Sequence, residues 1–99
     1  MAIDLVPLCT LRLQLKPPIQ VNAGPAGTRL QTADGAIIFV QYNGRMDTSQ
    51  GLRFPMTAYV APVFETGDER YEWLNRVQAV GKGILHEDLS LNYEWYEVR

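Results

Sequence analysis

The segment Phe64–Lys82, FETGDERYEWLNRVQAVGK, is the part of the chain from which we infer the fold, because it has the densest run of aromatic, charged and turn-forming residues. Its pattern predicts a strand, then a short capped helix, then a second strand. Thr66 and Glu69 have the spacing of a capping box, in which each side chain bonds the backbone N–H of the other residue. Asp68 would add negative charge to the first helical turn, where the helix dipole favours it.

The predicted helix has only about two turns, and so short a helix is marginal on its own. Tyr71 and Leu74 are three residues apart and therefore share one face, while Glu72 and Arg76 have the spacing of an i, i+4 ion pair. We expect the packing of Tyr71, Trp73 and Leu74 on a larger element, a sheet, to hold this helix in place.

Length and composition are typical of one small globular domain, covering residues 1–99. The formal net charge is −2 and no basic stripe is present, which argues against nucleic acid as a partner. The single cysteine, Cys9, excludes an internal disulfide. Because we find neither an apolar run of membrane-spanning length nor a signal-peptide pattern, we expect a cytoplasmic protein with no membrane partner.

Alternation of apolar and polar residues with period two predicts strands along most of the chain. The clearest is Leu8–Leu15, whose apolar face begins with Cys9. The last is Leu89–Val98, in which Leu89, Leu91, Tyr93 and Trp95 share one face. A further strand should cover Arg76–Leu85. The expected core is made of the apolar residues on these faces: Leu11, Leu13, Ile38, Val40, Phe64, Leu74, Val77 and Leu91.

Two more extended segments complete the prediction. Ala36–Tyr42 is apolar on both faces and should lie centrally or be covered on both sides, with Asn43–Gly44 ending it. Leu52–Phe64 contains Pro55 and Pro62, which would confine it to an edge or to bulges. We count five principal strands and one helical turn, so the expected fold is mostly β, an antiparallel β-barrel-like or sandwich fold with one short helical turn.

Turn-forming residues separate the predicted strands. Asp34–Gly35 and His86–Asp88 should form turns, and Asn22–Gly27 should form a longer loop rich in glycine and proline. Met46–Gly51 is polar and should also be a loop. Ile19–Val21 could form a short strand at most.

Several segments of the chain together match the pattern of one protein family. FETGDERYEWLNR is the most specific, and it is followed by VGKG and by a chain end of the type NYEWYEV. LVPLCTLRLQL, PPI, PAGTR and TADGAIIFVQYNGR extend the match over most of the chain. In these segments the sequence closely resembles an uncharacterised bacterial family, domain of unknown function 3237, also called uncharacterised protein family 0311. The resemblance implies a mostly antiparallel β-barrel-like fold, with no established reaction and no catalytic residues.

One departure from this resemblance bears on assembly. The family pattern implies further strands between its PAGTR-like and DGAIIFV-like segments, including a glycine-rich part with an Asp-Trp pair. Here Arg29 runs almost directly into Leu30–Gly35, so the chain is a shortened form lacking a central block of strands. A closed barrel needs about eight strands, and an exposed apolar edge tends to pair with another chain. We therefore expect a homodimer with Ile37 and Phe39 at or near the interface.

The side chains that could hold a ligand are aromatic residues, which pair an apolar body with a polar tip, and the charged residues near them. The candidates are Tyr59, Tyr71, Trp73, Arg53, Glu65 and Arg76. Tyr93 and Trp95 belong to the same aromatic set, and ordinary core packing is the alternative for all of these rings. The charged residues could instead form surface ion pairs, which contribute little.

No residue pattern supports a catalytic or metal site. Cys9 could be a nucleophile, but free cysteine is among the most buried residue types, and we expect it in the core. His86, Glu87 and Asp88 are consecutive and cannot easily converge on one ion, so a solvated turn is expected. The sequence contains neither a phosphate-binding loop nor a dinucleotide fingerprint. We therefore expect no catalytic residues, no metal and no cofactor.

Two classes of function stay open. The first is a small β-barrel-like binding or assembly protein, homodimeric, which could hold a small apolar or amphipathic ligand. The second is a small cofactor-independent enzyme of the isomerase or cyclase type, acting in a barrel cavity. The absence of a paired acid and base favours the first, whereas a strongly perturbed carboxylate or tyrosine pKa in a closed cavity would favour the second.

Overall fold

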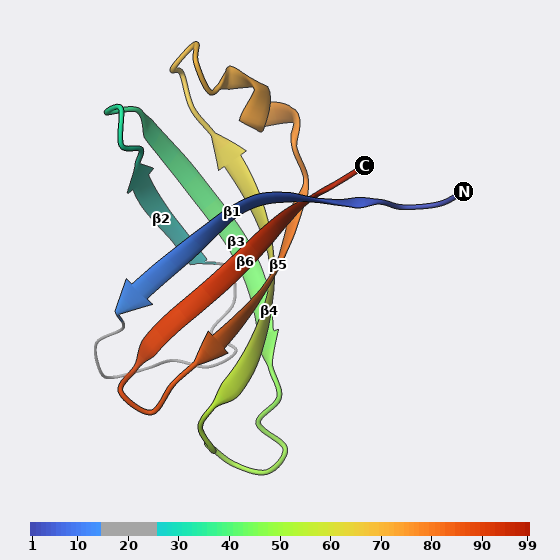
Figure 1. Cartoon of the computed structure of the whole chain (residues 1–99), viewed down its shortest axis with the longest axis vertical. Helices are drawn as coiled ribbons and strands as arrows, with labels where there is room; N and C mark the ends of the chain where they lie inside the picture. The colour runs from blue at the N-terminus through green and yellow to red at the C-terminus, as the bar shows by residue number, and fades with distance from the viewer. Residues whose placement is uncertain (15–25) are drawn as a thin grey trace.

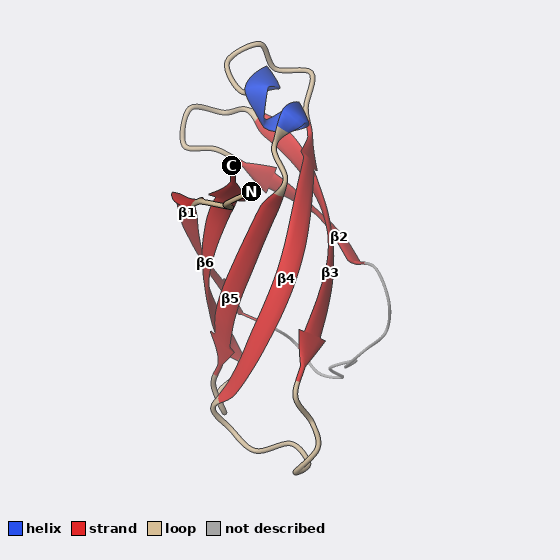
Figure 2. Cartoon of the chain, turned by 90° about the vertical axis from the view of Figure 1, so that its right-hand side faces the viewer, coloured by secondary structure: helices blue, strands red, loops and turns tan. Residues whose placement is uncertain are grey.

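The described part of the chain is one antiparallel sheet that curls into a half-barrel (Figure 1). A computed structural model describes residues 1–14 and 26–99. The strands are β1 (Leu5–Gln14), β2 (Ala26–Gln31), β3 (Ile37–Met46), β4 (Met56–Glu65), β5 (Ala79–Leu85) and β6 (Ser90–Val98), and the 3-10 helix η1 is Glu72–Arg76. Their order across the sheet is β1-β6-β5-β4-β3-β2. The predicted mostly β, antiparallel class is confirmed, and Figure 2 shows the curl from the side.

Six strands, rather than five, form this sheet within the described residues. The additional strand is β2, whose sequence AGTRLQ has no clear alternation. It pairs with β3, which also pairs with β4, so the segment Ala36–Tyr42 has the central position expected for it, and no strand is lacking beside it. β3 also continues through Gly44, which lies opposite Val60. The predicted short strand Ile19–Val21 and most of the predicted loop Asn22–Gly27 lie outside the described residues.

Pro62 lies inside the sheet, not at its edge, because β4 has β3 on one side and β5 on the other. The regular pairing of β4 with β5 ends at Val60, and a single bridge joins Val63 to Gln78 farther along. Pro62 falls between these points, where its missing N–H interrupts no ladder. The Gln78 side-chain amide donates to the Pro62 carbonyl at 3.3 Å. The register is the same on both sides of Pro62, so this segment lies neither at an edge nor at a bulge, and the expected placement is wrong.

The core lies on the concave face of the half-barrel. Its buried members are Ile38, Val40, Met56, Ala58, Val60, Phe64, Leu74, Ala79, Leu85, Leu91, Tyr93 and Trp95. Five of the expected core residues are among them. Leu11, Leu13 and Val77 are only partly buried against this cluster. For the two leucines the reason is that β1 is an edge strand, with a neighbour on one side only.

Two glycines of β5 make room for two aromatic rings of β6. Gly81 pairs with Trp95, and Gly83 pairs with Tyr93. A Cβ at Gly81 would overlap the indole Cδ1 atom, and a Cβ at Gly83 would lie 2.5 Å from the Tyr93 ring. The Tyr93 and Trp95 ring centroids are 5.9 Å apart, and Phe64 lies 5.8 Å from Trp95. The rings therefore lie flat against β5 and fill the centre of the concave face.

Cys9 is exposed, so the expectation that it lies on the buried face of its strand is wrong. The pairing of β1 with β6 changes register between Pro7 and Cys9. Such a bulge turns the following side chain away from the face that simple alternation predicts. As a result Leu8, and not Cys9, packs against the core.

The predicted short helical turn is present as the 3-10 helix Glu72–Arg76, but the predicted side-chain cap is wrong, since this helix has none. The Thr66 hydroxyl donates to the Ile37 carbonyl at 2.7 Å and accepts from the Asp68 N–H at 3.2 Å, so it does not bond Glu69. Leu74 is buried and anchors this helix, whereas Trp73 is 44% exposed and does not.

Candidate functional site

The outer, convex face of β4 is unusually apolar for an exposed surface. Tyr59, Ala61 and Val63 point outward from this strand, and Phe39 of β3 lies next to them. Tyr59 and Phe39 are each 56% exposed, and Val63 is 42% exposed. A strand that is apolar on both faces is normally covered on both, and adjacent exposed apolar side chains often mark an interaction surface. This face is therefore the first place to look for a functional site.

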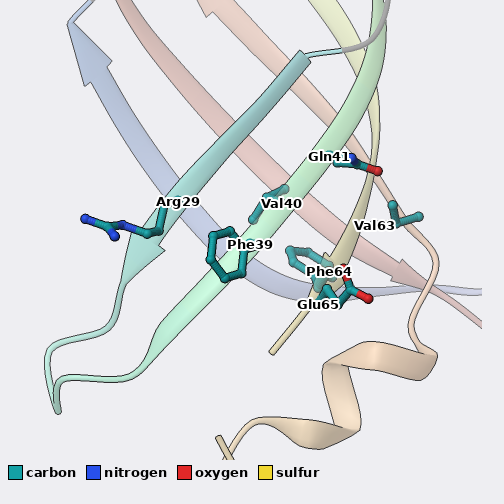
Figure 3. Close-up of a pocket in the computed structure, with 7 residues that line it drawn as sticks. All are labelled: Arg29, Phe39, Val40, Gln41, Val63, Phe64 and Glu65. Carbon is teal, nitrogen blue, oxygen red and sulfur yellow. The ribbon is translucent and has the colours of Figure 1, made fainter. Parts of the chain in front are cut away.

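A hollow of about 630 Å³ lies on this face, across β2, β3 and β4 (Figure 3). The residues that line it are Arg29, Phe39, Val40, Gln41, Val63, Phe64 and Glu65. Val40 and Phe64 belong to the buried face of the sheet. We call the other five, Arg29, Phe39, Gln41, Val63 and Glu65, the outer groove.

Three residues of the outer groove form one row across three strands. Arg29 pairs with Phe39, and Phe39 pairs with Glu65. Since neighbouring strands lie about 4.8 Å apart, the backbones of Arg29 and Glu65 are roughly 10 Å apart. Figure 3 shows their side chains on opposite sides of the Phe39 ring, which leaves that ring uncovered. The ion pairs found within the described residues involve neither Arg29 nor Glu65. The row thus presents a cation, an apolar ring and an anion.

A second hollow, of about 670 Å³, lies on the outer face of β1, β6 and β5. Two of its polar side chains, Arg12 and Asn92, are hydrogen-bonded to each other. Arg12 Nε donates to Asn92 Oδ1 at 3.3 Å, and the Asn92 amide lies 3.3 Å from His86 Nε2. Because these side chains already have partners, this hollow offers a weaker basis for binding than the outer groove.

The structure places the six predicted ligand-binding residues in three separate regions. Arg53 and Tyr59 line a third hollow, of about 360 Å³, beside the loop between β3 and β4. Glu65 belongs to the outer groove at the far end of β4, about 20 Å from Tyr59 along the strand. The remaining three, Tyr71, Trp73 and Arg76, lie at or beside η1. The described structure therefore does not bring the six residues together around one cavity.

Tyr71 belongs to a cluster that ties two loops together. Arg70 forms ion pairs with Asp34 at 3.2 Å and with Asp68 at 2.7 Å, and the Tyr71 hydroxyl donates to Asp34 at 2.9 Å. The side-chain hydrogen bond from Arg70 lowers the pKa of Asp68 to about 2. Hydrogen bonds from Thr32 and Tyr71 lower the pKa of Asp34. All the charges in this cluster are paired, so its role is structural.

The sequence analysis included Phe39 as an interface residue and Glu65 as a ligand-binding residue, but it assigned no role in a site to Arg29, Gln41 or Val63. Val63 could have been predicted from the alternation within β4. One face of this strand has Thr57, Tyr59, Ala61, Val63 and Glu65 in order, and the other face is apolar throughout. The two prolines of that segment obscured it, because they suggested an irregular edge.

Neither a metal site nor a membrane-spanning helix is found in the part of the chain that the structure describes. No group of three or more His, Cys, Asp and Glu side chains is placed there to hold an ion. No helix there is both long and apolar enough to cross a bilayer.

Comparisons with known proteins agree with this fold. No curated protein matches the chain significantly. A crystal structure described as a β-barrel-like protein from Acinetobacter baumannii AYE superposes with a TM-score of 0.70 at 19% sequence identity, covering 100% of this chain and 98% of the other. At that identity the likeness shows the fold alone. The family model "Protein of unknown function (DUF3237)" matches residues 26–98. Since this match covers most of the chain, the protein belongs to the DUF3237 family.

Proposed function

We propose that the protein is a binding and assembly protein that works as a homodimer, with the outer groove as the contact between two copies. The observation that carries this proposal is the row of Arg29, Phe39 and Glu65, because a second copy of the same row complements it. The expected interface residue Phe39 lies at the centre of this row.

The complementarity follows from two-fold symmetry. In a symmetric dimer the same patch meets itself. If one residue of the first copy contacts a second residue of its partner, then the second residue of the first copy contacts the first residue of the partner. A two-fold axis that runs along β3, midway between two facing sheets, reverses the row from left to right. Arg29 of each copy then faces Glu65 of the other, and the two Phe39 rings meet at the axis. Both charges gain a partner, and both rings lose their contact with water.

The size of the sheet allows such a contact. A specific interface buries at least about 1,200 Å², or roughly 600 Å² on each copy, which is a patch of about 25 × 25 Å. The chain measures 43 × 37 × 21 Å, so its broad outer face can hold this patch. Two packed sheets lie about 10 Å apart, a distance that opposed phenylalanine rings can bridge. Aromatic pairs contribute about 0.5–1.5 kcal/mol beyond the burial of their area.

Light scattering after gel filtration tests the proposal directly. The wild-type protein should have twice the 11.2 kDa mass of the chain at micromolar concentration. Arg29→Glu and Glu65→Arg should each shift the mass toward the monomer, because each places like charges opposite one another. The double variant Arg29→Glu/Glu65→Arg should restore the dimer, since it exchanges the two charges without changing their pairing.

A pair of matched variants distinguishes dimer formation through the outer groove from nonspecific association through other exposed apolar side chains. Phe39→Ser should favour the monomer, whereas Tyr59→Ser should leave the dimer intact. Tyr59 is as exposed as Phe39 and lies on the same face, but it is about 20 Å away along β4. A mass of 11.2 kDa at all concentrations, or a dimer that tolerates both single charge reversals, would contradict the proposal.

A further inference from the structure

The second hollow, of about 670 Å³ on the outer face of β1, β6 and β5, lies between two rows of side chains. From β1 to β5, the first row is Thr10, Glu94 and Lys82, and the second row is Arg12, Asn92 and Ile84. Residues two apart along a strand lie on the same face, so the two rows are about 7 Å apart. The backbone between them forms the floor of the hollow, which therefore runs across the strands.

Arg12 is held at one edge of its guanidinium group and free at the other. Its Nε atom donates to Asn92 Oδ1 at 3.3 Å, and the Asn92 amide nitrogen lies 3.3 Å from His86 Nε2. Within the described residues Arg12 donates through Nε alone, so its two terminal nitrogens keep their hydrogen-bonding capacity. Such a pair of nitrogens binds a carboxylate through two parallel hydrogen bonds. The contact with Asn92 thus orients the guanidinium group without occupying this pair.

The second hollow also has an excess of positive charge. Lys82 lines it and takes part in no ion pair within the described residues, although Glu94 is its direct neighbour on β6. Glu94 instead accepts a hydrogen bond from the Tyr96 hydroxyl at 3.1 Å. Arg12, Lys82 and Glu94 together give the hollow a positive balance, in a chain whose formal net charge is −2. This local charge is complementary to an anionic group.

An exposed apolar side chain ends the row that begins with Arg12. Ile84 of β5 follows Asn92 in this row and is 42% exposed. The backbones of Arg12 and Ile84 are roughly 10 Å apart, since one strand lies between them. A medium-length alkyl chain can cover this distance and remove part of the Ile84 side chain from water, which is favourable.

We propose that the second hollow binds a small amphipathic carboxylate. The carboxylate accepts two hydrogen bonds from the terminal nitrogens of Arg12, Lys82 attracts it from the opposite corner of the hollow, and the alkyl chain lies on Ile84. The pairing of Arg12 with Asn92 makes this hollow less suitable than the outer groove for contact with a second copy, but it orients Arg12 for such a ligand. No residue of the second hollow belongs to the outer groove, so the site does not depend on dimer formation.

Nuclear magnetic resonance on the arginine Nε–H groups and the backbone amides tests the proposal. Octanoate is the probe, and octylamine is its counterpart with a similar chain and a cationic head group. Octanoate should shift the Arg12 Nε–H and Ile84 amide signals in a saturable way, whereas octylamine should leave the Arg12 signal unchanged. Arg76 serves as an internal control, because it is exposed, has no ion pair among the described residues and lines none of the three hollows.

Single variants then assign the contacts. Arg12→Gln should weaken octanoate binding by about 2- to 5-fold, as expected for an exposed ion pair, and Arg76→Gln should not change it. The Ile84 amide reports the binding in Arg12→Gln, because the arginine signal is gone. Ile84→Ser should weaken the binding of octanoate but not that of acetate, which has no alkyl chain. Phe39→Ser should bind octanoate as tightly as the wild-type protein, which separates this site from the proposed dimer contact.

Three results would overturn the proposal. The first is an Arg12 Nε–H signal that octanoate does not move, or moves no more than the Arg76 signal. The second is an equal response of Arg12 to octanoate and octylamine, which would show that the charge of the head group is not recognised. The third is an unchanged octanoate affinity in Arg12→Gln. This variant should fold, because Arg12 is exposed on an edge strand.

Discussion

The side-chain amide of Asn75 bonds both sides of the Thr66 backbone. Its Oδ1 atom accepts from the Thr66 N–H at 2.8 Å, and its Nδ2 atom donates to the Thr66 carbonyl at 2.9 Å. The amide thus imitates a strand partner at the point where β4 has ended. It helps to hold η1 against the sheet, whereas the sequence analysis expected side-chain packing alone to do so.

Asn75→Ala should lower the free energy of unfolding by about 1–3 kcal/mol, because it removes two hydrogen bonds from a partly buried backbone. Urea denaturation measures this loss. Asn43→Ala is the matched control, since Asn43 is exposed on β3, and it should change the stability by less than about 0.5 kcal/mol. Equal effects of the two variants would mean that the amide bridge contributes nothing.

Thr66→Val should destabilise the protein by about 1–3 kcal/mol, although valine has nearly the same shape. It takes the hydroxyl donor from the Ile37 carbonyl and the acceptor from the Asp68 N–H. Thr66→Ser keeps both hydrogen bonds and should lower the free energy of unfolding clearly less. The comparison uses thermal or urea unfolding of the two variants, and a valine variant as stable as the serine variant would contradict the assigned role.

Gly81→Ala should destabilise the protein by about 1–3 kcal/mol, the usual effect of overpacking a core. The added methyl group would overlap the Trp95 ring. Gly67→Ala provides the contrast, because a Cβ there would meet nothing within 4 Å. That variant should be neutral or more stable by up to about 1 kcal/mol. Denaturation midpoints of the two variants should therefore move in different directions or by very different amounts.

Leu91 and Leu13 are direct partners across β6 and β1, yet they should respond differently to truncation. Leu91→Ala should cost about 2–5 kcal/mol, as for a fully buried leucine, because Leu91 is 5% exposed. Leu13→Ala should cost less, since Leu13 lies half-buried on the edge strand. If the measured unfolding free energies fell equally, β1 would be covered more completely than the single chain shows.

The ion pair between Arg70 and Asp68 should make stability depend on acidity. The folded pKa of Asp68 is about 2, below its ordinary value of about 3.9. A lowered carboxyl pKa stabilises the fold above about pH 4, and this contribution is lost as the pH falls toward 2. Arg70→Gln should raise the pKa of Asp68 and flatten the loss of stability in that window. Carboxyl carbon shifts in an acid titration measure both effects, and an Asp68 midpoint near 3.9 in the wild-type protein would refute the pairing.

The sequence alone was sufficient to predict the fold class and the orientation of its clearest strands. In Leu89–Val98 the alternation correctly predicted that Leu91, Tyr93 and Trp95 share one face, and the structure buries all three. The turn at Asp34–Gly35 was also correct, and Gly35 has the positive φ of 92° that favours glycine there. These features are local, because backbone geometry fixes the period of two within a strand and the conformation of a tight turn.

Only the tertiary structure decided which strands pair and where a side chain departs from the position that the alternation predicts. The bulge that exposes Cys9 depends on the register of β1 against β6. The partner of the Thr66 hydroxyl, the Ile37 carbonyl, is 29 residues away. The outer groove unites Arg29, Phe39 and Glu65 from three strands, and no spacing in the sequence shows that they form one row. Strand order and register arise from long-range pairing, so the residues that depend on them cannot be recognised from local alternation.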